Sequence, residues 1–173
     1  GLFREFLKRK GRRDIETSSC GIGALDGQPP SPHAVNACRQ FGADISKHLS
    51  RSITADLVRK ADYIFCMTFS HMHAVRRTYP EAAEKTFMLR EFCESLADFE
   101  KDILDPIGMS ADTYRECCRD INEALPEVLQ FIDEAKASVE LAGSAGGKRV
   151  RLAIGCDHGG FDLKVALKKF LGQ

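Results

Sequence analysis

Two kinds of hydrophobic pattern alternate along the first 136 residues of this 173-residue chain. Short apolar runs predict strands at Asp14 to Gly21, Tyr63 to Met67 and Thr86 to Leu89. Apolar residues at helical spacing predict helices that end before Gly11, run from Ser31 to Gly42, begin at Thr54, begin near a capping Ser70, and extend from Asp112 to Lys136. This alternation indicates an α/β sandwich of three layers with a mainly parallel sheet and right-handed crossovers.

The pattern changes after the last of these helices. Pro126 lies inside the apolar repeat and predicts a kink or a split there. The Gly- and Ala-rich stretch 137–148 predicts a flexible linker. Val150 to Ile154 then reads as a strand and Phe161 to Leu171 as a helix, the first βα unit of another doubly wound domain. We therefore expect a domain over 1–136, a linker over 137–148 and the start of a second domain over 149–173.

Composition narrows the classes of protein. Lys and Arg total 25, as do Asp and Glu, so no overall field favours nucleic acid or an anionic membrane as a partner. No apolar run approaches the roughly 18 residues of a membrane span, and no signal peptide is evident. The sequence predicts a cytoplasmic protein and leaves its oligomeric state open.

The cysteines and histidines do not form a metal-binding pattern. Seven cysteines occur without a CxxC pair, mostly within apolar or helical stretches, which favours buried thiols over disulfides or zinc. Cys117 and Cys118 point about 100° apart on a helix, so we expect one in the core and one at its flank. His71 and His73, two residues apart, lie on different helix faces. We predict neither a metal ion nor a cofactor.

A single acid stands out at the end of an apolar run. Pro106 forbids helix after Asp105, and Gly108 permits a tight turn, so the carboxylate lies on an ordered loop. Such an Asp is either a general acid that protonates a leaving group or only the first residue of a turn.

The segment from Asp105 to Tyr114 resembles the acid loop of the low-molecular-weight protein tyrosine phosphatases, especially their bacterial arginine-phosphatase branch. The resemblance covers roughly residues 1–136. Matching segments are Gly1 to Arg4 after the phosphate loop, Ser19 to Gly21 at the second strand exit, Pro32 to Val35 in the second helix, and Ala61 to Thr68 in the third strand.

The resemblance implies the phosphatase type I fold and specific roles. Asp105 would be the general acid, Ser19 would support the phosphate loop, and the substrate would be a phosphorylated protein or a small phosphoester. Ile107 stands where the family usually has an aromatic residue, which weakens the case for a flat phosphotyrosine ring.

The family's nucleophile is a thiolate in a Cys-x5-Arg-Ser loop, and this chain has no such loop. The residues six positions after its cysteines are Asp26, Asp44, Met72, Phe99, Glu123, Ala124 and Asp162. The resemblance therefore implies that this chain has the family fold without its first strand and that the 173 residues are inactive as a phosphatase. We expect codons upstream of Gly1 to encode that strand and loop.

A second resemblance concerns the end of the chain. Residues 152–164 resemble the start of B-type ribose-5-phosphate isomerases, with Cys156 and Gly159 replacing the usual Ser and Ala. This implies that Asp157 and His158 bind a sugar phosphate, although a turn with a capping Asp is the alternative. The chain would then be a fragment of a phosphatase and isomerase fusion, with a frame that continues beyond Gln173.

Three alternatives remain open at this point. An arsenate reductase of the same fold would need resolving cysteines, for which Cys93 is the loop candidate. A noncatalytic binding module would have lost its nucleophile naturally. Structurally, Val150 to Ile154 could dock in the slot of the missing strand, beside Tyr63 to Met67, instead of starting a separate domain.

Overall fold

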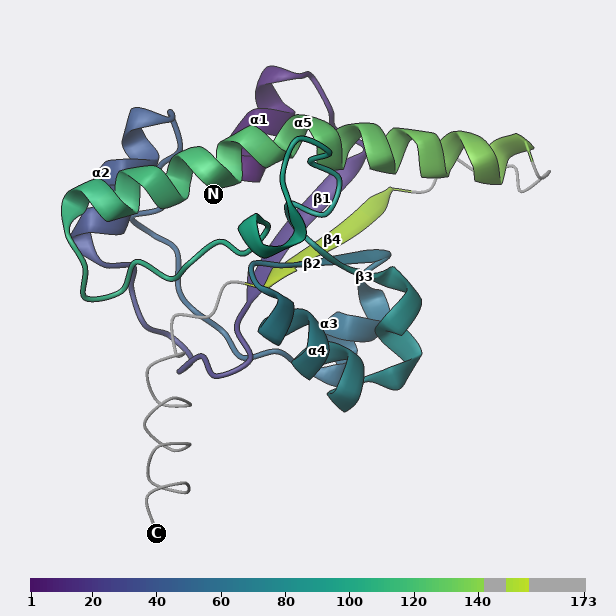
Figure 1. Cartoon of the computed structure of the whole chain (residues 1–173), viewed down its shortest axis with the longest axis horizontal. Coiled ribbons are helices and arrows are strands. Elements are labelled where there is room, and N and C mark those ends of the chain that lie inside the picture. Colours follow the sequence, from purple (N-terminus) through teal and green to yellow (C-terminus); the bar gives the residue numbers. More distant parts are fainter. Residues whose placement is uncertain (142–148, 156–173) are drawn as a thin grey trace, which may run out of the picture.

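The computed structural model describes residues 1–141 and 149–155. Its centre is a sheet of four strands in the order β1-β4-β2-β3, and each neighbouring pair is parallel (Figure 1). The strands are β1 (Ile15–Cys20), β2 (Tyr63–Cys66), β3 (Thr86–Met88) and β4 (Val150–Gly155). The predicted α/β class and parallel sheet are confirmed.

Helices cover both faces of the sheet and make three layers (Figure 1). One face carries α1 (Leu2–Arg9), α2 (Pro32–Gln40) and the long α5 (Ala111–Leu141). The other carries α3 (Ala55–Lys60) and α4 (Phe69–Thr78). Two short 3₁₀ helices, η1 (Pro80–Lys85) and η2 (Asp98–Glu100), lie in the connections.

Strand β2 shows how the sequence divides the core between the two faces. Alternate side chains of a strand point to opposite sides. Phe65 accordingly packs with α1, α2 and α5, whereas Ile64 and Cys66 pack with α3 and α4. All three side chains are buried. Helices cover this strand on both faces, which is why its residues form a continuous apolar run.

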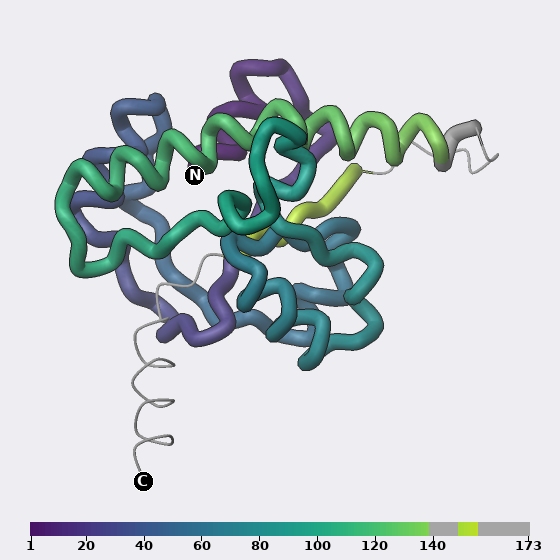
Figure 2. Tube along the Cα trace, in the orientation of Figure 1, coloured from purple at the N-terminus to yellow at the C-terminus, as the bar shows by residue number. Residues whose placement is uncertain are grey.

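Strand β4, the last strand among the described residues, occupies a central place in the sheet. Figure 2 shows β4 running between β1 and β2. Leu152 is level with Thr17 of β1 and with Tyr63 of β2, and it is 1% exposed. The hypothesis that Val150 to Ile154 docks beside the strand at Tyr63 is therefore confirmed.

Helix α5 bears on two expectations, and of the kink or split predicted at Pro126 it excludes the split. It continues through Pro126 without splitting, because Leu125, Val128 and Ile132 are buried on both sides of the proline and hold the two halves to the sheet. It also continues to Leu141, so the first five residues of the predicted linker, 137–141, are helical. The remainder of that linker, 142–148, lies outside the described residues.

Two further details concern the helix starts. Ser31 caps α2 as predicted, since its Oγ accepts a hydrogen bond from the Ala34 amide. Thr68, not Ser70, caps α4, because its side chain accepts from the His71 amide and β2 ends only two residues earlier. Within the described ranges, none of the helices combines the length and apolar character needed to cross a bilayer.

Candidate functional site

Three strands end side by side at the carboxyl edge of the sheet. Cys20 of β1, Gly155 of β4 and Cys66 of β2 are level with one another. In open parallel sheets the loops that leave this edge are where ligands bind. Both phosphatase residues suggested by the sequence, Ser19 and Asp105, belong to this edge.

Ser19 is the penultimate residue of β1 and contacts the segment before α3. Its Oγ lies 3.4 Å from Nε2 of His48, and its carbonyl accepts a 2.8 Å hydrogen bond from Nε of Arg51. The Gly21 amide donates to the Arg51 carbonyl over 2.9 Å, which continues the pairing one residue beyond the strand. The backbone at Ser19 is thus fixed, while its hydroxyl makes one long polar contact within the part of the chain that the structure describes.

The loop after β1 is closed by the same segment. The amide and the hydroxyl of Ser52 both donate to Oδ1 of Asp26, at 2.6 and 2.8 Å, and these bonds lower the pKa of that carboxyl. A cavity of about 40 Å³ remains between the loop and the segment, and Ser19, His48 and Arg51 are among the residues that line it. This space accommodates a water molecule and little more.

Asp105 lies on a turn that is fixed on both sides. Before it, the Ile103 amide donates to the carbonyl of Met67, directly after β2, over 2.8 Å. After it, Ser110 caps α5 by accepting from the Thr113 amide. Oδ1 of Asp105 accepts a 3.0 Å hydrogen bond from the Ile107 amide.

The turn leaves the Asp105 side chain exposed. Gly108 follows with φ +75, a conformation that favours glycine and reverses the chain. Among the described residues, Oδ2 of Asp105 accepts no hydrogen bond, so one carboxylate oxygen remains available to a ligand. The turn and the general acid proposed from the sequence are therefore compatible, because one oxygen makes the turn.

The structure does not bring all predicted site residues together. In the described part of the chain Ser19 and Asp105 share no hydrogen bond, since their side chains contact His48 and Ile107 respectively. Asp157 and His158, predicted to bind a sugar phosphate, lie outside the described residues.

Sequence reasoning missed the two residues that contact Ser19. His48 and Arg51 are 29 and 32 residues away along the chain. They lie in a polar stretch without helical or strand periodicity, so no pattern indicates their position. The feature that brings this stretch to Ser19 is the parallel bridge between Gly21 and Ser52. This bridge exists only in the folded chain and leaves no pattern in the sequence.

The Cys20 thiol at this edge is not prepared as a nucleophile. Burial raises the pKa of Cys20, and the charge of Arg51 offsets this only in part. A thiol with a raised pKa carries little thiolate at neutral pH.

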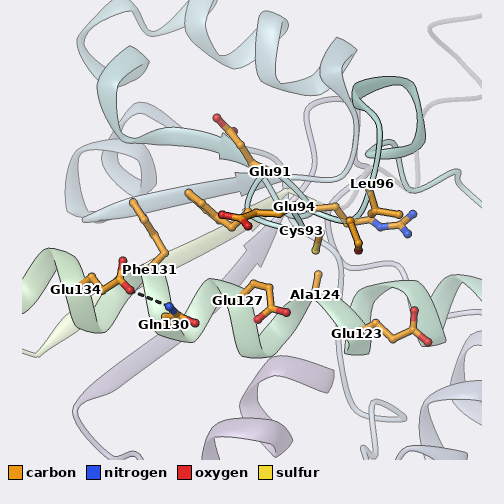
Figure 3. A pocket seen from close by; sticks show the side chains of 13 residues that line it. Glu91, Cys93, Glu94, Leu96, Glu123, Ala124, Glu127, Gln130, Phe131 and Glu134 are labelled. Carbon is orange, nitrogen blue, oxygen red and sulfur yellow. Dashed lines mark hydrogen bonds between the residues drawn. The ribbon is translucent and has the colours of Figure 1, made fainter.

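A larger cavity of about 690 Å³ lies elsewhere, between the loop that follows β3 and helix α5 (Figure 3). Glu123, Ala124 and Glu127 of α5 line it on one side, and Cys93 and Glu94 of the loop line it on the other. Burial and these α5 carboxylates raise the pKa of Cys93, which opposes the resolving role that an arsenate reductase would require. Asp105 is not among the residues that line this cavity.

The described residues do not form a cluster of metal ligands. Across residues 1–141 and 149–155, no three His, Cys, Asp or Glu side chains gather closely enough to hold a metal ion. The candidate site therefore consists of Asp105 on its turn and of Ser19 with its two contacts.

Known proteins resemble this chain over most of its length. The family model for low molecular weight phosphotyrosine protein phosphatase matches residues 1–138. A protein-arginine-phosphatase of Bacillus subtilis (strain 168) is 28% identical over 127 residues, which cover 73% of this chain and 81% of the relative. A probable low molecular weight protein-tyrosine-phosphatase, EpsP of Ralstonia nicotianae, is 32% identical over 127 residues, covering 73% and 79%.

Solved structures agree with the sequence comparisons. The low molecular weight protein tyrosine phosphatase from T. tengcongensis superposes with a TM-score of 0.68 at 31% identity, covering 75% of this chain and 86% of that one. A YwlE mutant from Bacillus subtilis gives the same TM-score at 26% identity, covering 76% and 86%. The chain belongs to the low molecular weight phosphotyrosine protein phosphatase family.

Proposed function

We propose that this chain is the acid-bearing part of a protein phosphatase that removes phosphate from modified side chains, with Asp105 as the general acid. The observation that carries the proposal is the placement of Asp105, within a chain of this family, on a fixed turn at the carboxyl edge of the sheet. The relatives named protein-arginine-phosphatase and protein-tyrosine-phosphatase support a phosphorylated protein as substrate.

The geometry of the turn suits proton donation. The hydrogen bond from the Ile107 amide holds Oδ1 and orients the carboxyl group, and the exposed side chain leaves Oδ2 for a leaving group. A general acid at this position supplies the proton that a departing tyrosine oxygen or arginine nitrogen needs as its bond to phosphorus breaks.

Ser19 has a positioning role in this proposal. Because the Arg51 guanidinium fixes the Ser19 carbonyl and His48 lies beside its hydroxyl, the side chain is held at the strand end where a phosphate-binding loop would pass. The hydroxyl can donate a hydrogen bond to such a loop.

The residues around the acid favour phosphoarginine over phosphotyrosine. Ile107 and Met109 are 44% and 54% exposed beside Asp105 and offer aliphatic surface in place of an aromatic ring. A flat phenyl ring gains from stacking on an aromatic side chain, whereas an extended guanidinium chain does not depend on it.

We further propose that the 173 residues alone are inactive. None of the seven cysteines is followed by Arg at the sixth position, so no loop combines a thiolate with an arginine for the phosphate. An arsenate reductase is not favoured, since the relatives are named as phosphatases and the pKa of Cys93 is raised.

We also propose, from the isomerase resemblance, that the end of the chain binds a sugar phosphate. A cytoplasmic location is a separate proposal. Binding of a sugar phosphate by Asp157 and His158 can be measured by titrating ribose 5-phosphate into the 173-residue protein. Loss of binding in Asp157→Asn is expected, and an absence of binding to the unaltered protein would contradict the proposal.

The acid role is tested by supplying what the chain lacks. The 173-residue protein should hydrolyse neither aryl phosphate nor phosphoarginine. A chimera with a family strand and Cys-x5-Arg loop joined before Gly1, and with residues 149–173 removed so that β4 does not occupy the place of that strand between β1 and β2, should turn over both. In that chimera, Asp105→Asn should lower kcat by about 10²- to 10⁴-fold, with the larger loss for poor leaving groups.

Asp112→Asn is the matched control. It removes the same charge seven residues later, where Asp112 forms an ion pair with Arg115 on the outside of α5. We expect it to leave kcat unchanged. An equal loss in Asp105→Asn for good and poor leaving groups, or an equal loss in the control, would remove Asp105 from the role.

A further inference from the structure

Helices α2 and α5 bring two buried thiols together. Cys38 lies in the second half of α2 and Cys118 near the start of α5, and their Sγ atoms are 3.7 Å apart. The two side chains are 7% and 6% exposed. They lie in the interface between the helices, 80 residues apart in the chain.

The distance is short enough for a covalent bond to form with small movements. A disulfide requires about 2.05 Å between the sulfurs, so closure from 3.7 Å takes about 1.7 Å, shared between two side chains. The helices themselves already pack against each other.

The surrounding groups shift the pKa values of Cys38 and Cys117 in opposite directions. The hydrogen bond with Cys118 lowers the pKa of Cys38, against the opposite effect of burial. Burial, with the carboxylates of Asp120 and Asp105, raises the pKa of Cys117 to about 12. The Cys38 thiol thus ionises more easily than the Cys117 thiol, which stays protonated.

We propose that Cys38 and Cys118 form a reversible disulfide when the protein meets a peroxide. The Cys38 thiolate attacks a peroxide oxygen, the O–O bond breaks, and a sulfenic acid forms with release of hydroxide. The Cys118 sulfur then attacks the sulfenic sulfur, the S–O bond breaks, and water leaves with the thiol proton. In sum, two thiols and one hydrogen peroxide give one disulfide and two waters, and a dithiol reductant restores both thiols.

The crosslink has a measurable effect on folding. It closes a loop of about 80 residues and removes conformational freedom from the unfolded chain. We expect the melting temperature of the oxidised protein to rise by about 5 to 10 °C, and to return after treatment with dithiothreitol. Because the pair is buried, we also expect oxidation over hours at millimolar peroxide rather than within seconds.

Peptide mapping identifies the bond. The reduced 173-residue protein is incubated with hydrogen peroxide, remaining thiols are blocked with N-ethylmaleimide, and the chain is digested with trypsin and Asp-N without reductant. Cys38 then falls in peptide 26–39 and Cys118 in peptide 116–119, which also holds Cys117. The expected product is these two peptides joined, with the mass of their sum less two hydrogens plus one N-ethylmaleimide on Cys117.

Variants assign the sulfur. Cys117→Ser leaves Cys118 as the only thiol of its peptide, and we expect the crosslink to persist in it. Cys38→Ala and Cys118→Ala should abolish both the crosslink and the rise in melting temperature. The Cys117→Ser protein decides the question even where these buried substitutions prevent folding.

Three results would overturn the proposal. One is an oxidised Cys117→Ser protein without the joined peptides. Another is a crosslink that survives in Cys118→Ala through Cys117. The third is irreversible oxidation of Cys38 to a sulfinic acid with no bond formed.

Discussion

The two edges of the central sheet use their polar residues in opposite ways. At the amino edge, Asp14 precedes β1 and accepts two hydrogen bonds from Arg12, at 2.8 and 2.9 Å, and another from Lys136 of α5. Arg12 also binds Asp133 of α5. The amide of Val150, the first residue of β4, donates to the Asp14 carbonyl over 2.9 Å.

Among residues 1–141 and 149–155, the carboxyl edge shows no comparable network of charges. Ser19 has one 3.4 Å side-chain contact, and the Asp105 carboxylate makes one bond within its own turn. Charges at the amino edge satisfy each other and join β1, β4 and α5, whereas the carboxyl edge leaves polar groups for a ligand. Stability and chemistry are thus assigned to different ends of the same strands.

Strand β4 spans both edges, so the largest expected effect is there. Leu152→Ala removes a side chain that is 1% exposed between β1 and β2, and it should lower the free energy of unfolding by about 2 to 5 kcal/mol. Urea denaturation followed by circular dichroism measures the change.

The neighbouring residue provides the control. Arg151 is exposed on the same strand, and Arg151→Ala should change the free energy of unfolding by about 0.5 kcal/mol or less. Equal losses for the two variants would mean that β4 does not pack in the sheet. The two edges would then not be joined by this strand.

The next effect separates the edges by pH. The Arg12 hydrogen bonds, followed by that of Lys136, hold the pKa of Asp14 well below its usual range. A lowered folded pKa means that the stabilisation is complete above the unfolded value, about 3.9, and is lost as the pH falls below it. Because this carboxyl is 43% exposed, solvent screening limits the loss in Asp14→Asn to about 1 kcal/mol at pH 7.

Denaturant curves for Asp14→Asn at several pH values test this expectation. The difference from the unaltered protein should shrink as the pH falls from about 5 to about 2. Asp26→Asn at the carboxyl edge is the matched variant, and we expect a smaller loss, since an amide oxygen can accept the same bonds from Ser52. A larger loss in Asp26→Asn than in Asp14→Asn would reverse the assignment of stability to the amino edge.

Local signals predicted the parts of the molecule that depend on neighbours in sequence. The apolar run at Tyr63 predicted strand β2, and Ser31 followed by Pro32 predicted the start of helix α2. The order Asp105, Pro106 and Gly108 gave the turn, because its hydrogen bond spans only two residues.

Distant pairings were harder to predict from one sequence. The bond between Lys136 and Asp14 joins residues 122 apart, and His48 reaches Ser19 across 29. The placement of β4 was predicted only as a hypothesis, because strand pairing depends on which edges remain open in the folded sheet. Helix α5 passes Pro126 because tertiary packing outweighs the local cost of a proline.

The smallest effect sharpens the comparison on a single strand. Ser18 and Ser19 are neighbours in β1, but Oγ of Ser18 donates a 3.1 Å hydrogen bond to the Leu152 carbonyl, whereas Oγ of Ser19 is 3.4 Å from His48. We expect Ser18→Ala to cost about 1 kcal/mol and Ser19→Ala about 0.3 kcal/mol, because the longer, exposed contact exchanges readily with water. Paired urea titrations resolve a difference of this size when each variant is measured in replicate.

If Ser19→Ala were as costly as Ser18→Ala, the carboxyl edge would contribute to stability and Ser19 would be structural. A small loss of stability, combined with reduced turnover in the chimeric phosphatase, would instead support its position beside a phosphate loop.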